Sequence, residues 1–64
     1  MKKYLVLQHF TWGKLQLEKG QQVVTHDIND HDSFIFETNH KDKRQRVTTQ
    51  AIARMESLEK IKAA

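Results

Sequence analysis

The chain has 64 residues, no cysteine, no proline and a formal net charge of +3. Its length allows one small domain with a modest core, and the missing cysteines exclude a disulfide framework or a thiolate metal site. The apolar run from Tyr4 to Leu7 is shorter than the core of a signal sequence and far shorter than the ~20 residues of a membrane span, so we expect a complete cytoplasmic protein.

The first half of the chain predicts three strands and a tight turn. Residues 3–10 alternate in polarity with apolar side chains on both faces, and residues 14–18 alternate as a half-buried strand does. Trp12, between these strands, is expected in the core because a lone tryptophan is usually the largest core residue of a small domain. Gly20 suits a turn with positive φ, and residues 22–26 form the third strand.

Two further strands are predicted in the second half. Residues 27–33 are rich in Asp, Asn and Ser, which favour turns. Residues 33–38 form the clearest strand, and we expect Phe34 and Phe36 to face the core. A polar hairpin tip then leads to a fifth strand over residues 43–47.

From Thr48 onward the pattern predicts a C-terminal helix over about residues 49–61. Thr48 or Thr49 can cap its start by accepting from free backbone amides. Apolar residues then recur at every third position, at Ile52, Met55, Leu58 and Ile61. The fold class is therefore mainly β (α+β), either a small five-stranded barrel or a strongly curved antiparallel sheet, with one C-terminal helix.

A family resemblance adds to this interpretation. Residues 14–24 resemble the SH3 segment in which an alternating strand runs into a Lys-Gly turn and a valine-rich strand. Residues 30–36 resemble the acidic loop and aromatic strand that follow, and residues 44–47 lie where those barrels end in a helical turn. The resemblance covers most of residues 3–50 and implies an SH3-like barrel, as in small SH3-like proteins of bacteria, phages and plasmids. The ALYDY stretch, paired tryptophans and Pro-x-x-Tyr signature of eukaryotic SH3 domains are missing, so their groove for proline-rich peptides is not implied.

Metal binding and catalysis find little support in the sequence. Five possible ligands share one loop region: His26, Asp27, Asp30, His31 and Asp32. They match neither a zinc pattern nor a calcium loop, so we interpret them as turn formers and expect no cofactor. Ser33 and Ser57, the only serines, have no evident base, and a chain this small has little room for a substrate pocket. We expect no enzymatic activity.

A basic segment is the strongest functional signal. Its members are Lys41, Lys43, Arg44 and Arg46. Arg44 and Arg46 share one strand face and can meet successive phosphates of DNA or RNA. The alternative interpretation is a solvated strand protected by charge from edge pairing.

Two functions therefore compete, both non-enzymatic. The first is a nucleic-acid-associated accessory or regulatory protein of a bacterium, phage or plasmid, which acts through the basic segment. The second is a protein-interaction or self-assembling module that binds a partner, or itself as a homodimer, through an exposed strand edge or the C-terminal helix, with Met55, Leu58 and Ile61 as its surface. Basic charge favours the first and the long apolar helix stripe favours the second; neither involves a membrane or a small-molecule substrate.

Overall fold

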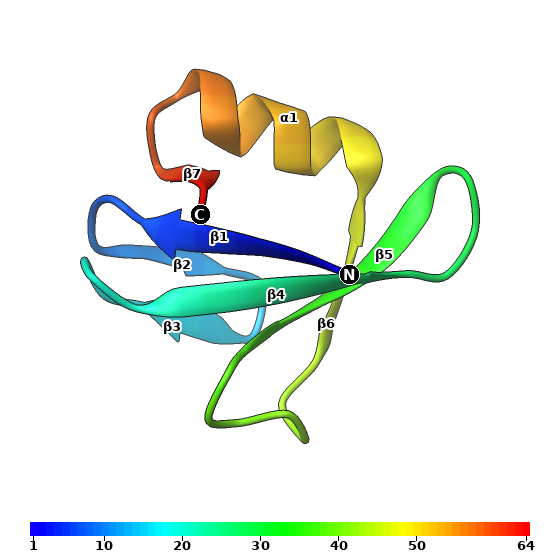
Figure 1. The fold of residues 1–64 in the computed structure, drawn as a ribbon, viewed down its shortest axis with the longest axis horizontal. Helices are drawn as coiled ribbons and strands as arrows, with labels where there is room; N and C mark the ends of the chain where they lie inside the picture. Colours follow the sequence, from blue (N-terminus) through cyan, green and yellow to red (C-terminus); the bar gives the residue numbers. More distant parts are fainter.

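Seven strands and one helix make up the protein, described here by a computed structural model of residues 1–64 (Figure 1). In chain order they are β1 (Lys2–Val6), β2 (Phe10–Trp12), β3 (Leu15–Leu17), β4 (Gln22–Asp27), β5 (Asp32–Glu37), β6 (Gln45–Thr48), α1 (Thr49–Ser57) and β7 (Ile61–Ala63). The chain is thus mainly β with one short helix, as the sequence predicts. No helix is long and apolar enough to cross a membrane.

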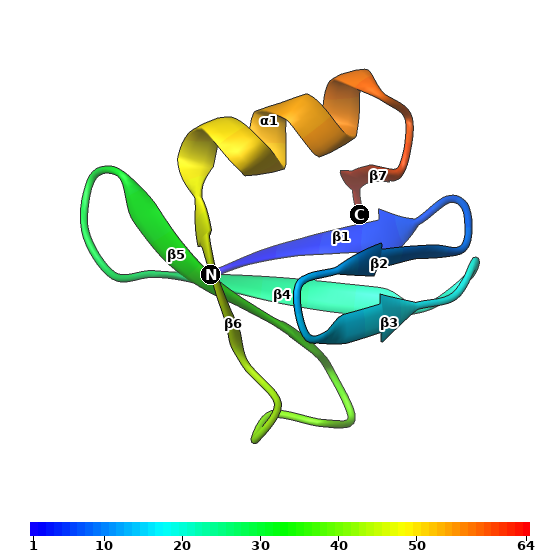
Figure 2. The same cartoon turned by 180° about the vertical axis from the view of Figure 1, so that it is seen from behind.

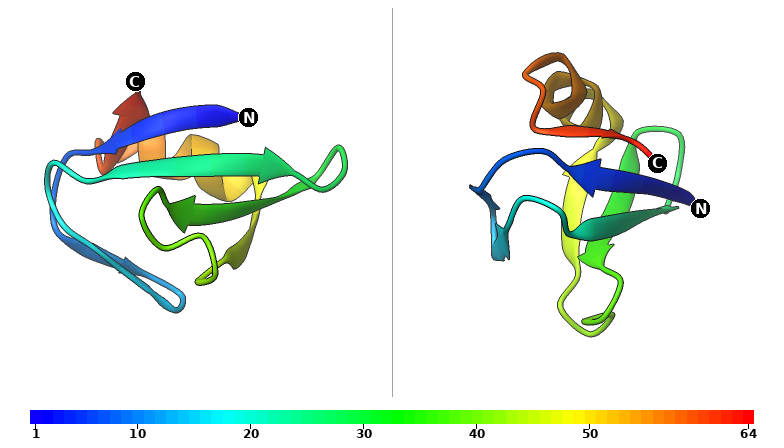
Figure 3. Two further views of the ribbon diagram at one scale, coloured as in Figure 1. Left: turned by 60° about the horizontal axis from the view of Figure 1, so that its bottom comes forward. Right: turned by 60° about the vertical axis from the view of Figure 1, so that its left-hand side comes forward.

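The strands form two antiparallel units. One is a five-stranded sheet in the order β6-β5-β4-β1-β7, and the other is the β2–β3 hairpin. The edge strands β6 and β7 do not pair with each other, so the sheet is open and not a closed barrel. Figure 2 shows the hairpin in front of β1 and β4, and α1 runs along the top of the molecule. The two views in Figure 3 show that the five-stranded sheet is curved.

The hydrophobic core lies between the sheet, the hairpin and the helix. It consists of Tyr4, Val6, Phe10, Trp12, Leu15, Leu17, Val23, Ile35, Val47, Ile52 and Ile61. The hairpin supplies four of these residues because all its apolar side chains point the same way. Trp12 is only 8% exposed, which confirms its predicted place in the core. We call the side of the five-stranded sheet that faces this core the inner face.

The orientation of β5 differs from the prediction. Ser33 and Ile35 are 0% exposed on the inner face, whereas Phe34 and Phe36 are only partly buried on the opposite face. Burial of Ser33 is tolerated because its hydroxyl donates a 3.0 Å hydrogen bond to Asp27 Oδ1. Both faces of β5 carry apolar side chains, so period two alone did not reveal which face the hairpin covers.

The helix is shorter than predicted and is not C-terminal. It begins as expected, with Thr48 Oγ1 accepting from the Ala51 amide at 3.0 Å. It ends at Ser57, where Glu59 adopts a φ of 58° and the Lys60 amide donates to the Met55 carbonyl at 3.0 Å. This is a Schellman termination with Glu59 in the position that glycine usually takes. The chain then reverses, and Ile61 begins β7 rather than ending the helix.

The predicted turn at Gly20 is confirmed, but two strand limits change. Gly20 has a φ of 93°, a conformation that side chains rarely adopt. The strand predicted over residues 3–10 is split between β1 and β2, and the fifth predicted strand begins at Gln45 rather than at residue 43.

Candidate nucleic-acid interface

The side of the sheet away from the core carries two rows of neighbouring side chains. The register pairs Lys3 with Val24 and Val24 with Phe36, which gives one row across β1, β4 and β5. It pairs His26 with Phe34 and Phe34 with Arg46, which gives a second row across β4, β5 and β6. Side chains two residues apart on a strand share a face, so both rows lie on one surface.

Two hollows occupy this surface. The larger, about 570 Å³, is lined by Met1, Lys3, Val24, Phe36, Thr38 and Lys41. The smaller, about 310 Å³, is lined by His26, Phe34, Phe36, Lys41 and Arg44. Phe36 and Lys41 belong to both, so the hollows adjoin. We call their combined lining residues the outer face.

The charge of the outer face is one-sided. Lys3, Lys41 and Arg44 line the hollows, and no aspartate or glutamate does. The phenyl rings lie among these cations, and the Arg44 guanidinium carbon is 5.1 Å from the centre of the Phe34 ring. Such a contact is attractive because the ring face carries negative charge density. The outer face therefore combines cations with aromatic surface.

The four residues of the predicted basic segment do not form one patch. Lys41 and Arg44 lie on the outer face, whereas Lys43 lines a different hollow, between the sheet and the β2–β3 hairpin, together with Glu37. Arg46 is in register with the outer face, but its Nη2 donates to Asp32 Oδ2 at 2.9 Å. Two of the four are therefore available together for an anion on the outer face.

Most of the outer face lies outside the predicted basic segment, and three of these residues, Lys3, Phe34 and Phe36, supply cationic or aromatic surface. Lys3 lies beside the predicted segment only through the pairing of β1 with β4, although its alternation with buried Tyr4 already indicated an outward side chain. Phe34 and Phe36 were assigned to the core because large aromatic side chains are usually buried. The partly buried state of both rings comes from the single-sided packing of the sheet.

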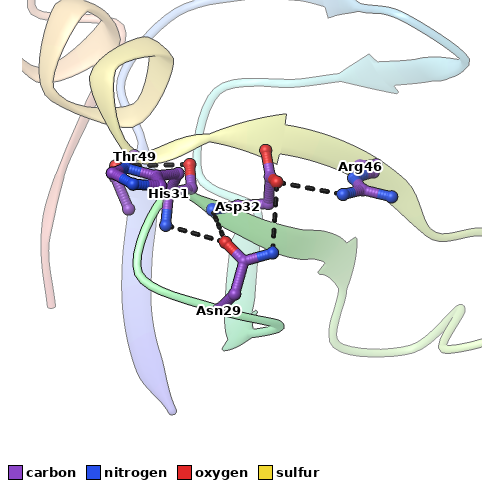
Figure 4. Close-up of polar contacts among 5 residues, drawn as sticks. All are labelled: Asn29, His31, Asp32, Arg46 and Thr49. Carbon is purple, nitrogen blue, oxygen red and sulfur yellow. Dashed lines mark hydrogen bonds and ion pairs between the residues drawn. The ribbon is translucent and has the colours of Figure 1, made fainter.

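The β4–β5 loop is held by its own polar groups (Figure 4). Asn29 Oδ1 accepts from the amides of His31 and Asp32 at 2.8 and 2.9 Å, and Asn29 Nδ2 donates to Asp32 Oδ2 at 3.3 Å. The His31 carbonyl accepts from the Thr49 amide at 2.9 Å, which ties the loop to the start of α1. No three His, Asp or Glu side chains gather as a metal site would require.

Hydrogen bonding also affects the titration of this loop. The Arg46 guanidinium, followed by the Asn29 amide, holds the pKa of Asp32 below its usual range. Asp32 is therefore a charged partner for Arg46 at neutral pH, and any anion that approaches Arg46 must compete with it.

The second predicted surface, along the helix, is not continuous. Leu58 is 54% exposed, but Met55 packs against the core and Ile61 is 1% exposed. Ile61 is buried because it belongs to β7, where it pairs with Val6. One exposed leucine is ordinary for a folded protein and does not make an apolar docking surface.

The outer face offers side chains that can attract phosphates and planar rings that can contact bases.

Comparisons with known proteins give no further information on what the outer face binds. Family models, curated proteins and solved structures were compared with the chain, and none of them matches it.

Proposed function

We propose that the protein is a non-enzymatic module that binds nucleic acid through the outer face. The observation that carries this proposal is the grouping of Lys3, Lys41 and Arg44 around two adjoining hollows whose lining includes no acidic residue. Cations so placed displace the counterions of a phosphate backbone, which supplies most of the affinity in sequence-independent binding. Phosphates carry no base identity, so these contacts position the strand and do not select a sequence.

The proposed binding segment is a revision of the basic run seen in the sequence. Arg44 and Lys41 contribute directly and Lys3 joins them from β1. Arg46 contributes less because contact with a phosphate would require it to leave Asp32. Lys43 contributes less because it lines a different hollow, whose lining also includes Glu37.

The cellular role that fits this binding is an accessory or regulatory one. The SH3-like small proteins that the sequence resembles occur in bacteria, phages and plasmids, and we propose a similar setting here. The binding module would act by occupying nucleic acid in the cytoplasm rather than by transforming it.

Salt-dependent binding of paired variants tests the proposal. Affinity for labelled oligothymidine and for a duplex is measured by fluorescence anisotropy between about 50 and 200 mM salt. The variant Lys41→Ala/Arg44→Ala removes two contacts and should lower the log–log salt slope by roughly 1.4 to 1.8 units, given ~0.7–0.9 per phosphate. The fold should persist, since exposed substitutions change stability little.

Lys19→Ala/Arg54→Ala is the matched control. It removes the same charges from exposed positions outside both outer-face hollows, and α1, which holds Arg54, lies at the opposite end of the molecule from the β5–β6 loop (Figures 1 and 2). Its salt slope should equal that of the wild type. Absence of wild-type binding at low salt, or equal slopes in the two double variants, would refute the proposed function.

A further inference from the structure

We propose that the outer face binds single-stranded nucleic acid, with unstacked bases seated on Phe36 and on the Arg44–Phe34 pair. This inference rests on the proposed function and names its substrate class. DNA and RNA strands share the chemistry concerned, which is a phosphate backbone with bases whose flat faces are free.

Phe36 is the first stacking position. Its ring is only partly buried and lines both hollows, and its cross-strand neighbour Val24 is 6% exposed and lines the larger one. A planar base placed there would cover apolar surface that water now contacts. Lys3 and Lys41 line the same hollow, where they can reach the phosphates of that nucleotide.

The Arg44–Phe34 pair is the second position. The guanidinium already lies over the ring at 5.1 Å, so a planar, delocalised cation is held on the sheet surface. Bases stack on arginine as well as on aromatic rings. Arg44 and Phe34 therefore place a planar cation and an aromatic ring at one position, where a base can stack on either.

The spacing of the two positions favours an unstacked strand. Phe34 and Phe36 are two residues apart on β5, so their Cα atoms are separated by about 6.6 Å. Stacked bases on one strand are only ~3.4 Å apart. Two neighbouring nucleotides can occupy both positions only if their bases have separated from each other, which a single strand allows.

A duplex cannot offer its bases to this surface. The flat faces of duplex bases are covered by their neighbours, and the edges lie in grooves of which the wider is ~12 Å across. Phe34 and Phe36 lie on β5, inside a five-stranded sheet and flanked by β4 and β6. With neighbouring strands about 4.8 Å apart, this sheet is broader than the groove. The rings therefore cannot enter a groove, and a duplex would contact the cations alone.

Four ligands matched in their number of phosphates separate these contributions. They are oligothymidine, an abasic strand of the same length, a shorter duplex with the same total number of phosphates, and oligouridine as the RNA arm. Stacking contributes ~1–3 kcal/mol per base, or about 5- to 150-fold in affinity. We expect oligothymidine and oligouridine to bind at least about 5-fold more tightly than the abasic strand and the duplex.

Two variants remove planarity and leave charge in place. Phe36→Leu should weaken oligothymidine binding about 5-fold or more, with an unchanged salt slope and unchanged duplex binding, and Phe36→Tyr should restore it. Arg44→Lys keeps the positive charge and should act in the same way as Phe36→Leu. If Phe36→Leu fails to fold, Arg44→Lys and ultraviolet crosslinking of the wild type to oligothymidine keep the test decisive, with the adduct expected within residues 34–36.

The outcomes distinguish the two proposals. Equal affinity for single, abasic and duplex ligands, or a crosslink outside the outer face, would overturn single-strand stacking and leave phosphate binding intact. If the wild-type protein shows no salt-dependent binding to any of these ligands, both the proposed function and single-strand stacking are overturned.

Discussion

The two faces of the sheet are built from adjacent residues but have opposite surroundings. On β5, Ile35 is 0% exposed under the hairpin and helix, whereas its neighbour Phe36 lines an open hollow of about 570 Å³. The hairpin and α1 together supply five of the eleven core residues, and all of them pack on the inner face. A chain this short has enough residues to cover only one face of the sheet, so the aromatic side chains on the other face stay partly accessible. Along β5, burial follows which face is covered and not side-chain size.

The largest expected effect comes from substitutions on β5 that compare these faces. Ile35→Ala should destabilise the protein by about 3 kcal/mol, from lost burial and the cavity that remains. Phe36→Ala should cost about 1 kcal/mol, because its ring is partly exposed before unfolding. Urea denaturation followed by circular dichroism measures both, and Ile35→Val, at about 1 kcal/mol, serves if Ile35→Ala does not fold. Equal losses from the two alanine variants would mean that the outer face is covered.

A smaller effect, at alkaline pH, tests how well the inner face is sealed. Burial, and then the nearby charges of Glu56 and Asp27, raise the pKa of Tyr4, which is 5% exposed. Because the folded pKa lies above the unfolded one, this contribution to stability is complete below about pH 10 and is lost as the pH rises through the folded pKa. Tyr4 is the only tyrosine, so tyrosinate absorbance reports its pKa directly. Tyr4→Phe should remove this part of the alkaline loss of stability; an ordinary tyrosine titration in the folded protein would contradict the burial.

The smallest effect is expected at Asp32, on the open side. Its pKa is lowered by the hydrogen bond from Arg46 and then by that from Asn29, so its contribution to stability is present above its unfolded pKa and is lost as the pH falls through the folded one. Arg46→Ala should raise the pKa of Asp32 toward its ordinary value, measured by carboxyl chemical shifts in an NMR titration. Global stability should change little, because exposed ion pairs contribute little. An unchanged pKa in Arg46→Ala would show that the pair does not form in solution.

Much of the fold could be predicted from local patterns. Alternation located β3, β4, β5 and β6 approximately and joined β1 and β2 into one strand. Gly20 marked a turn with positive φ, and Thr48, one of the two candidate caps, starts the helix. The end of the helix could not be found because the three-residue apolar spacing continues through Leu58 to Ile61, while the residue at the reversal is Glu59 rather than glycine. β7, with three residues, is too short to produce a periodic signal of its own.

The candidate site was predictable only in part. The density of Lys and Arg predicted Lys41 and Arg44, which line the outer face. It also included Arg46, which pairs with Asp32, and Lys43, which lines a different hollow together with Glu37. Lys3 joins the site through a strand pairing that no local pattern specifies. Phe34 and Phe36, the phenylalanines of the outer face, were assigned to the core because alternation defines two faces of a strand but does not show which of them will be covered.

The pairing of β7 with β1 has a consequence for how fast the protein folds. It joins Val6 to Ile61, 55 residues apart along the chain, and the Ala64 amide donates to the Lys3 carbonyl at 3.0 Å. Closing so long a loop costs about 2 kcal/mol more chain entropy than closing the β2–β3 hairpin, and pairings distant in sequence slow folding. We therefore expect the hairpin to form early and β7 to dock after the rate-limiting step. Contacts made by Ile61 would then slow unfolding without speeding folding. The docking of β7 would therefore set the rate of unfolding, and with it the lifetime of the native state.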